Sequence, residues 1–149
     1  MVICIFGENC TGKSAIANRL KENLGADIYN GKDYLRFAKS EPEAKKAFSA
    51  LLADHSAGDQ PLIYVAAEPE QLQLLPEQCL RVLVTAELPV IRERFAARMG
   101  GRLPPPVESM LERKHGMFDG FPHDLLVKTG DQSAADACKQ IVSLLSDAK

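Results

Sequence analysis

The sequence predicts a three-layer α/β protein with a five-stranded, mainly parallel β-sheet that is covered by helices on both faces. Short apolar runs alternate with longer amphipathic segments along the 149 residues, an order typical of strands joined by crossover helices. Apolar runs such as VICIF at 2–6 lack polar alternation, as expected for strands buried on both faces. A chain of this length buries one sizeable core, and it contains no repeat or interdomain linker. We therefore predict a single domain over residues 1–149.

Local patterns define the individual elements. Ile16 and Leu20 lie four residues apart on one face of a helix that Gly25 is expected to end. Pro42, in the stretch SEPE, suits a first helical turn, so we expect a break in the helical stretch there. Two glycines and three consecutive prolines in GGRLPPP (100–106) predict a loop without regular structure. The predicted strands are 2–6, 26–30, 61–69, 80–87 and 124–130, and the predicted helices are 13–24, 33–57, 70–75, 88–99, 107–118 and 133–145.

Composition argues against several classes of partner. The formal net charge is −2, which disfavours a general nucleic-acid-binding protein. The four cysteines form no CxxC pair and have no metal-like spacing with the three histidines, so we expect free thiols in a reducing compartment. No apolar stretch has the length of a membrane span, and the first residues lack the features of a signal peptide. We expect a cytoplasmic protein that is a monomer or a weak dimer, with no nucleic-acid or membrane partner.

Residues 7–14, GENCTGKS, match the phosphate-binding pattern GxxxxGK[ST] in full, between a predicted buried strand and a predicted helix. Glycines allow successive backbone N–H groups to point at phosphate oxygens, and the following helix adds its positive N-terminal end. Lys13 has the length to reach the β- and γ-phosphates of ATP, and the Ser14 hydroxyl is suited to bind Mg²⁺. The residues expected to contact ATP through this loop are Gly7, Glu8, Asn9, Cys10, Thr11, Gly12, Lys13, Ser14 and Ala15.

Other motifs indicate which kind of nucleotide protein this is. The base-reading NKxD motif of switch GTPases and an LSGGQ-like transporter signature are missing, which leaves the small kinases. The helix after the strand at 80–87 carries Arg94 and Arg98 on one face, and Arg102 follows in the glycine- and proline-rich loop. Mobile positive charge of this kind covers the oxygens of a phosphoryl group during transfer. The alternative interpretation is that these arginines simply form a solvated, charged face of the helix.

With these residues in place, the sequence resembles the nucleoside monophosphate kinase family, with adenylate kinase as the closest pattern and shikimate and cytidylate kinases as cousins. GKDYLR (31–36) is similar to the family's GDxLR segment, and ERFAAR (93–98) is similar to its lid helix pattern. The resemblance implies a sheet in the order 2-3-1-4-5, a short acceptor-binding insert around 31–58 and a short lid around 98–110. It also implies that Arg36 binds the phosphate or carboxylate of the acceptor.

The remaining roles follow from the same resemblance. Arg94 is expected to lie against the adenine ring, Arg98 to clamp the ATP phosphates, and Arg102 to be the lid arginine. Arg113 matches the basic helix that returns from the lid and is assigned to the acceptor. Gly130 and its neighbours are expected near the base.

Several residues depart from the family pattern. The segment DGFPH at 119–123 falls beyond the lid, and we interpret it as a coincidental loop. AAEP stands where the family carries DGFPR, so Glu68 becomes the candidate carboxylate for orienting Mg²⁺ or accepting a proton, or else a capping residue. Asp33 has two competing roles, a general base toward an acceptor hydroxyl or the N-cap of its helix.

Together these observations predict an ATP-dependent phosphotransferase that moves the γ-phosphoryl group of ATP·Mg²⁺ to a nucleotide or nucleoside. Lys13, Arg98, Arg102 and Asp33 are the expected catalytic residues. One alternative is a kinase of another small hydroxyl metabolite, similar to shikimate kinase. A second alternative is a regulatory module that binds ATP or GTP and transfers nothing.

Overall fold

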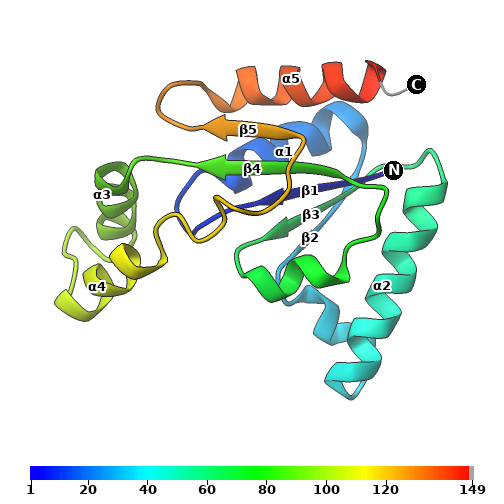
Figure 1. Ribbon diagram of the computed structural model, residues 1–149, viewed down its shortest axis with the longest axis horizontal. Coiled ribbons are helices and arrows are strands. Elements are labelled where there is room, and N and C mark those ends of the chain that lie inside the picture. The colour runs from blue at the N-terminus through cyan, green and yellow to red at the C-terminus, as the bar shows by residue number, and fades with distance from the viewer. Residues whose placement is uncertain (148–149) are drawn as a thin grey trace.

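The computed structural model describes residues 1–147 and confirms the predicted α/β architecture (Figure 1). The strands are β1 (Val2–Phe6), β2 (Asp27–Asn30), β3 (Leu62–Ala66), β4 (Leu80–Thr85) and β5 (Leu125–Lys128). The helices are α1 (Lys13–Leu24), α2 (Glu41–Ala57), α3 (Leu88–Arg98), α4 (Pro105–Lys114) and α5 (Ala134–Asp147), with 3₁₀ helices η1 (Asp33–Phe37) and η2 (Pro69–Leu74). All strand pairs are parallel, and the sheet order is β2-β3-β1-β4-β5, as predicted.

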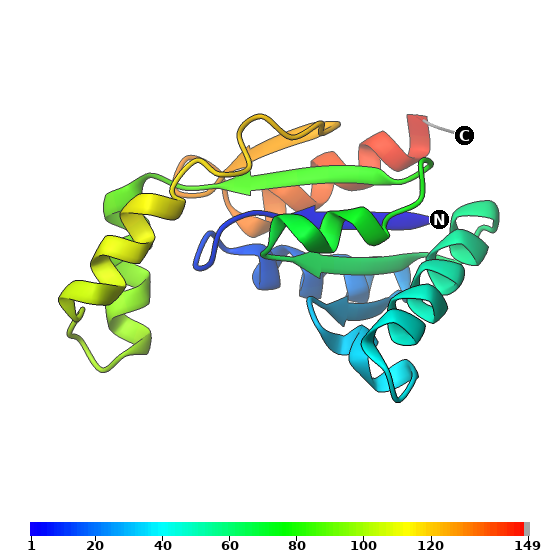
Figure 2. The ribbon, with the colours of Figure 1, turned by 60° about the horizontal axis from the view of Figure 1, so that its bottom comes forward.

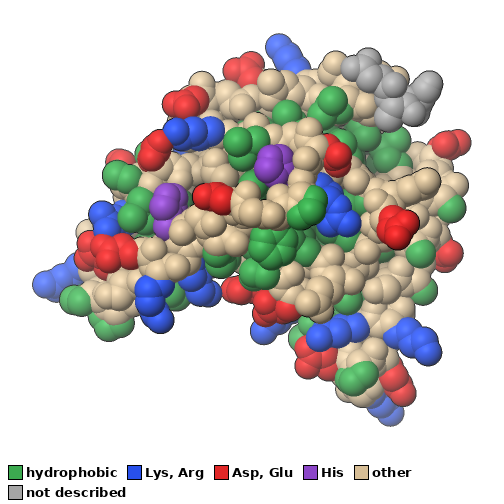
Figure 3. Space-filling view, viewed as in Figure 1, with side chains coloured by type: hydrophobic (Ala, Val, Ile, Leu, Met, Phe, Trp, Pro, Cys, Tyr) green, Lys and Arg blue, Asp and Glu red, His purple; other side chains and the backbone are tan. Residues whose placement is uncertain are grey.

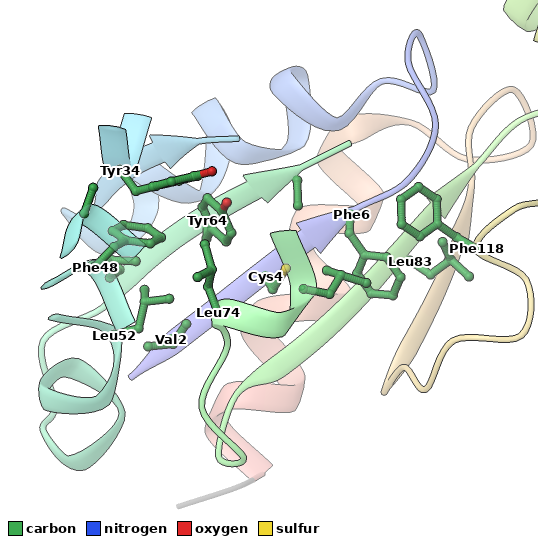
Figure 4. Close-up of a cluster of buried hydrophobic side chains, with 14 residues drawn as sticks. Val2, Cys4, Phe6, Tyr34, Phe48, Leu52, Tyr64, Leu74, Leu83 and Phe118 are labelled. Carbon is green, nitrogen blue, oxygen red and sulfur yellow. The ribbon is translucent and has the colours of Figure 1, made fainter. Parts of the chain in front are cut away.

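Strand β1 lies at the centre of the sheet and divides the core into two layers. Val2, Cys4 and Phe6 point toward the face that α2 and η2 cover, where they join a cluster rich in aromatic side chains (Figure 4). Ile3 and Ile5 point to the opposite face, against α1 and α5. All five side chains are buried, which explains why the strand is apolar without alternation. The central position of β1 places the loop that follows it in the middle of one sheet edge.

Local sequence explains most element boundaries. The expected break in the segment 33–57 is present, because η1 ends before α2 begins with Ser40 as its N-cap. The Ser40 hydroxyl accepts a hydrogen bond from the backbone N–H of Glu43 at 3.4 Å. The structure corrects the predicted loop 100–106, because α4 already begins at Pro105, where proline suits a first helical turn. The same helix ends at Lys114, short of the predicted residue 118, since Gly116 has φ +80°.

Helices α3 and α4 form a hairpin that projects from the side of the molecule, as Figure 2 shows. The hairpin has a small core of its own, built on Ile91 and Leu111, and this core also contacts Cys10. Arg92 on α3 pairs with Glu108 and Glu112 on α4. Gly100 and Gly101, both with positive φ, lie between the two helices. These contacts make the hairpin a unit that touches the β1–α1 loop.

Acidic and basic side chains are interspersed on the face of the molecule that Figure 3 shows, including the projecting hairpin. None of the helices within residues 1–147 combines the length and the apolar character that a membrane span requires.

Candidate active site

The loop from Gly7 to Gly12 curls tightly between β1 and α1. Gly7 has φ +158°, and a Cβ atom there would lie 2.1 Å from the carbonyl oxygen of Val84 on β4. Gly12, the residue before α1, has φ +100°, and Cys10 also has a positive φ of 63°. The first glycine is therefore required by close contact with the sheet, and the second by backbone conformation. This is the geometry that directs backbone N–H groups toward a bound anion.

Lys13, the first residue of α1, folds back over the loop. Its ammonium group donates hydrogen bonds to the carbonyl oxygens of Gly7, at 2.8 Å, and Glu8. The side chain is buried, and this burial lowers the pKa of Lys13 to about 8, with the positive charge of Arg98 acting in the same direction. The lysine is thus held inside the loop with a pKa close to neutral pH.

A pocket of about 470 Å³ opens where the strands end at the carboxyl edge of the sheet. Its lining has two halves that come from different parts of the chain. The first half surrounds the β1–α1 loop and includes Asn9, Cys10, Gly12, Lys13, Ser14, Ala15 and Arg98. The second half comes from the ends of β2 and β3 and from η2, and it includes Asn30, Gly31, Val65, Ala67 and Gln71. The first half matches the predicted donor residues.

A second pocket of about 440 Å³ shares Gly12 and Ala15 with the first and is also lined by Arg94 and Gly130. The guanidinium of Arg94 donates hydrogen bonds to the carbonyl oxygen of Cys10 and to the hydroxyl of Thr129, both at 3.1 Å. The structure therefore brings together the two residues predicted to lie near the base. This second pocket adjoins the loop at Gly7–Gly12, called the phosphate loop below. A nucleotide site requires such an arrangement, with space for the base beside the loop that binds the phosphates.

Thr129 connects three segments behind the loop. Its hydroxyl donates to the carbonyl oxygen of Thr11 at 2.6 Å and receives the hydrogen bond from Arg94. A Cβ atom on Gly12 would lie 3.2 Å from the Thr129 methyl group. The segment after β5, the phosphate loop and α3 are thereby linked through a single buried side chain. Sequence reasoning did not single out Thr129.

Glu8 was predicted among the ATP-binding residues, and its side chain points away from the pocket toward the end of α4. One carboxylate oxygen accepts a hydrogen bond from the backbone N–H of Gly116 at 2.6 Å, and the other lies 3.1 Å from Nδ1 of His115. The Glu8 side chain is 11 % exposed. The loop between β1 and α1 is therefore attached directly to the residues that follow α4, the second helix of the hairpin.

Of the predicted lid arginines, the structure places one in the pocket. Arg98 lines it near Lys13, whereas Arg102 is exposed in the loop after Gly101 and lies outside the pocket lining. The segment predicted as a short lid, around 98–110, comprises the end of α3, the loop 99–104 and the first turns of α4, and its action as a lid stays a prediction. The catalytic role of Arg102 stays a prediction.

The residues predicted for the acceptor lie outside the lining of the main pocket. The Arg36 side chain is 74 % exposed and pairs with Asp33 at 3.6 Å. Asp33 accepts a hydrogen bond from the backbone N–H of Asn30 at 2.7 Å and does not cap η1, whose N-cap is Lys32. The carboxylate of Asp33 therefore stabilises the turn between β2 and η1.

The other candidate acceptor residues also have different partners here. Glu68 lies 3.5 Å from the ammonium group of Lys114 on α4, and Arg113 is exposed on the same helix. The DGFPH segment forms the turn after α4, where Asp119 and His123 line a separate pocket of about 320 Å³. This position agrees with the interpretation of DGFPH as a loop that does not take the place of the family motif.

Within the second half of the pocket, sequence reasoning missed Gln71. This side chain is 6 % exposed and lies on η2 directly after the segment AAEP. The available signal was the spacing from Glu68 to Gln71 across Pro69, since a glutamine three residues after a capping position returns its side chain to the backbone, as it does here.

Comparison with known proteins adds to this geometry. The sequence matches no family model and no curated protein. Among solved structures, an uncharacterized protein from Eubacterium ventriosum has a TM-score of 0.71 at 16 % identity, with 98 % of each chain covered. The YorR protein from Bacillus subtilis, in complex with phosphorylated GDP, has a TM-score of 0.68 at 21 % identity, covering 98 % of this chain and 96 % of that one.

Shikimate kinase from Acinetobacter baumannii, in complex with shikimate, has a TM-score of 0.66 at 14 % identity, covering 99 % of this chain and 94 % of that one. The chain therefore has the α/β fold of P-loop kinases similar to shikimate kinase. At these identities the likeness concerns the fold, and a specific likeness to adenylate kinase stays a prediction.

Proposed function

We propose that this protein is a phosphotransferase that moves the γ-phosphoryl group of ATP to a small-molecule acceptor. The observation that carries the proposal is the two-sided pocket, in which Lys13 and Arg98 lie on one side and the ends of β2 and β3 form the other. A site that only binds nucleotide needs the first half alone. The fold shared with shikimate kinase supports the same conclusion.

Three side chains of the donor half, together with the loop N–H groups, have chemical roles in this proposal. Lys13 and the loop N–H groups bind the β- and γ-phosphates, and Arg98 neutralises charge as the phosphoryl group moves. The exposed Ser14 hydroxyl lines the pocket at the start of α1, and it fits Mg²⁺, which keeps few protein ligands beside phosphate oxygens. The ion would supply further charge neutralisation at the phosphates.

The transfer step is a direct in-line displacement. The acceptor oxygen forms a bond to the γ-phosphorus while the bond between that phosphorus and the β,γ-bridging oxygen breaks, and ADP leaves. The acceptor proton passes to a carboxylate or to solvent. Asp33 and Glu68 remain the two candidate carboxylates, and closure of the pocket has to bring either of them closer.

We propose nucleosides and nucleotides as the first acceptor class to examine, with small hydroxyl metabolites as the second. The second class gains support from the fold shared with shikimate kinase and from the position of Arg36, the predicted holder of an acceptor phosphate, which lies outside the pocket lining. The regulatory-module alternative is favoured by the same displacement of Arg36, Asp33 and Glu68 from the lining.

An acceptor-dependent assay tests the proposal. ATP consumption is measured with nucleosides, nucleoside monophosphates and small alcohols, and the reaction should require both Mg²⁺ and an acceptor. Lys13→Ala should lower kcat by about 10²–10³-fold, because it removes preorganised charge from the phosphates. Lys21→Ala, a change of an exposed lysine on the same helix, is the matched control and should leave kcat unchanged. ATP binding without turnover on every acceptor would favour the regulatory module.

A further inference from the structure

The amide of Gln71 is fixed in one orientation at the acceptor half of the pocket. Its Oε1 atom accepts hydrogen bonds from the backbone N–H groups of Ala67, at 3.0 Å, and Glu68, at 3.2 Å. Only the amide oxygen can accept both bonds, so the orientation follows from the network. Within residues 1–147, no atom accepts a hydrogen bond from the Nε2 group of Gln71. A side chain that is 6 % exposed thus presents an unpaired donor to the pocket.

The loop after β2 leaves room for the Nε2 group of Gln71, because it has a glycine, Gly31, at the point of contact. A Cβ atom on Gly31 would lie 3.0 Å from Nε2 of Gln71, a distance that real side chains rarely tolerate. The Tyr64 hydroxyl donates a hydrogen bond to the carbonyl oxygen of Gly31 at 2.6 Å, and the Gly31 N–H donates to Val65 at 2.8 Å. The Gln71 amide and the Gly31 backbone that faces it are therefore both held in place by hydrogen bonds at the ends of β2 and β3.

The acceptor half of the pocket carries no charged side chain among the described residues that line it. Asn30 and Gln71 supply amides, and the other lining residues there are glycine, valine and alanine. The charged residues of the neighbouring segments lie outside this lining: Lys32 and Glu70 are exposed beside Gly31 and Gln71, Arg36 pairs with Asp33, and Glu68 pairs with Lys114. A carboxylate or phosphate held against these residues would contact amides and apolar groups, and the cations of the pocket, Lys13 and Arg98, lie in its other half.

We propose that Gln71 recognises the acceptor and that the acceptor is an uncharged molecule. It would present a carbonyl, hydroxyl or ring-nitrogen lone pair to Nε2 beside the hydroxyl that becomes phosphorylated. A site with a fixed amide donor favours such a partner, since a compound that lacks it leaves the donor without a hydrogen bond inside the pocket. This inference rests on the proposed function and narrows its acceptor class to neutral polyols, sugars and nucleosides.

Gln71→Glu is the sharpest test of the donor. The glutamate keeps an oxygen for the N–H groups of Ala67 and Glu68 and replaces the Nε2 donor by an acceptor. We expect KM for a neutral acceptor to rise by more than tenfold, with KM for ATP unchanged. Gln73→Glu adds the same charge on the same 3₁₀ helix at an exposed position outside the pocket lining, and it should leave both constants unchanged.

The acceptor panel consists of pairs that differ in charge, namely ribonucleosides against their 5′-monophosphates and alditols against the corresponding aldonates. Each compound is tested for stimulation of ATP consumption and, by calorimetry, for binding to the protein loaded with a non-hydrolysable ATP analogue. Turnover or binding of neutral members, lost in Gln71→Glu and kept in Gln73→Glu, supports the inference.

The other outcomes separate the two proposals. Turnover with charged members alone, or an equal effect of both glutamate variants, overturns the neutral-acceptor inference and leaves the kinase proposal standing. Binding of neutral compounds that depends on Gln71 but gives no turnover supports the recognition role and overturns the kinase proposal. If no member of either set binds or is phosphorylated, both proposals fail.

Discussion

The burial of one side chain, Lys13, determines how the charge of the β1–α1 loop depends on pH. The side chain is enclosed by the loop it serves, and its ammonium group is bound to two of the loop's own carbonyl oxygens. A lysine in this position is desolvated before any phosphate arrives, and its pKa falls from 10.5 to about 8. The charge that the donor needs is therefore sensitive to pH in an accessible range.

We predict that ATP affinity falls as the pH rises through about 8, because Lys13 then loses the proton that attracts phosphate. Above this pH the dissociation constant should increase by up to about tenfold per unit, as a one-proton linkage requires. Calorimetric titration between pH 7 and 9.5 measures the effect, with Lys13→Met as the reference. A pH profile that is the same in both proteins would contradict the prediction.

The stability of the nucleotide-free protein should change in the opposite direction. The folded-state pKa of Lys13 is lowered, so the unfolded state holds more protons between about pH 8 and 10.5. The contribution of Lys13 to the free energy of unfolding therefore rises with pH in that window. Comparison of urea denaturation for the native protein and Lys13→Met isolates this contribution.

At the scale of elements, the α3–α4 hairpin is attached to the body through Glu8. Both of its carboxylate oxygens contact the residues that follow α4, one through the backbone N–H of Gly116 and one through His115. We predict that Glu8→Ala destabilises the protein by about 1–2 kcal/mol, because the change removes two partly buried hydrogen bonds. Urea denaturation measures the cost.

Glu22→Ala is the control for that experiment, since Glu22 is exposed on α1 and has no ion pair within the described residues. It should change the free energy of unfolding by less than about 0.5 kcal/mol. Equal losses in both variants would show that the contact with Gly116 contributes nothing specific.

The elements themselves were largely predictable, for reasons that individual residues show. The strands VICIF and LIYVA are apolar throughout and need no tertiary information, and the parallel order was confirmed. The start of α4 could not be predicted, because a run of prolines is compatible both with a loop and with a first helical turn. The ends of strands were predicted too long, as for 61–69, where β3 ends at Ala66 and η2 begins at Pro69 with Glu68 as its N-cap.

The site was predictable only where a motif fixes the backbone. GENCTGKS specifies a loop by its glycines, so Lys13 and Ser14 could be placed in advance. The outward direction of Glu8 depends on where α4 ends, and the exposure of Arg36 depends on how η1 packs, and neither is written in a local pattern. Gln71 was missed because its role arises from contacts with Ala67 and Gly31.

At the scale of the whole molecule, the hairpin stands away from the sheet in both ribbon views (Figures 1 and 2). Arg98 lies at the end of α3, and the glycines that follow allow the chain to change direction. We predict that ATP together with an acceptor closes the hairpin over the pocket and slows tryptic cleavage after Arg98 and Arg102 by at least about tenfold.

A time course of digestion, followed by mass spectrometry, measures this protection. Cleavage after Lys139, an exposed residue on α5 far along the chain from the hairpin, provides the internal control and should proceed at an unchanged rate. Protection of all sites alike would indicate general stabilisation by the ligand rather than closure.

The two halves of the pocket differ in how their lining residues are distributed along the chain. The lining residues proposed to bind the donor are scattered over residues 9–15, helix α3 and the segment after β5. The lining residues proposed to face the acceptor all fall within a single segment of the chain, from Asn30 to Gln71. Under the proposed function the protein is modular: replacement of this one segment would change the acceptor specificity and leave the residues that bind the nucleotide in place.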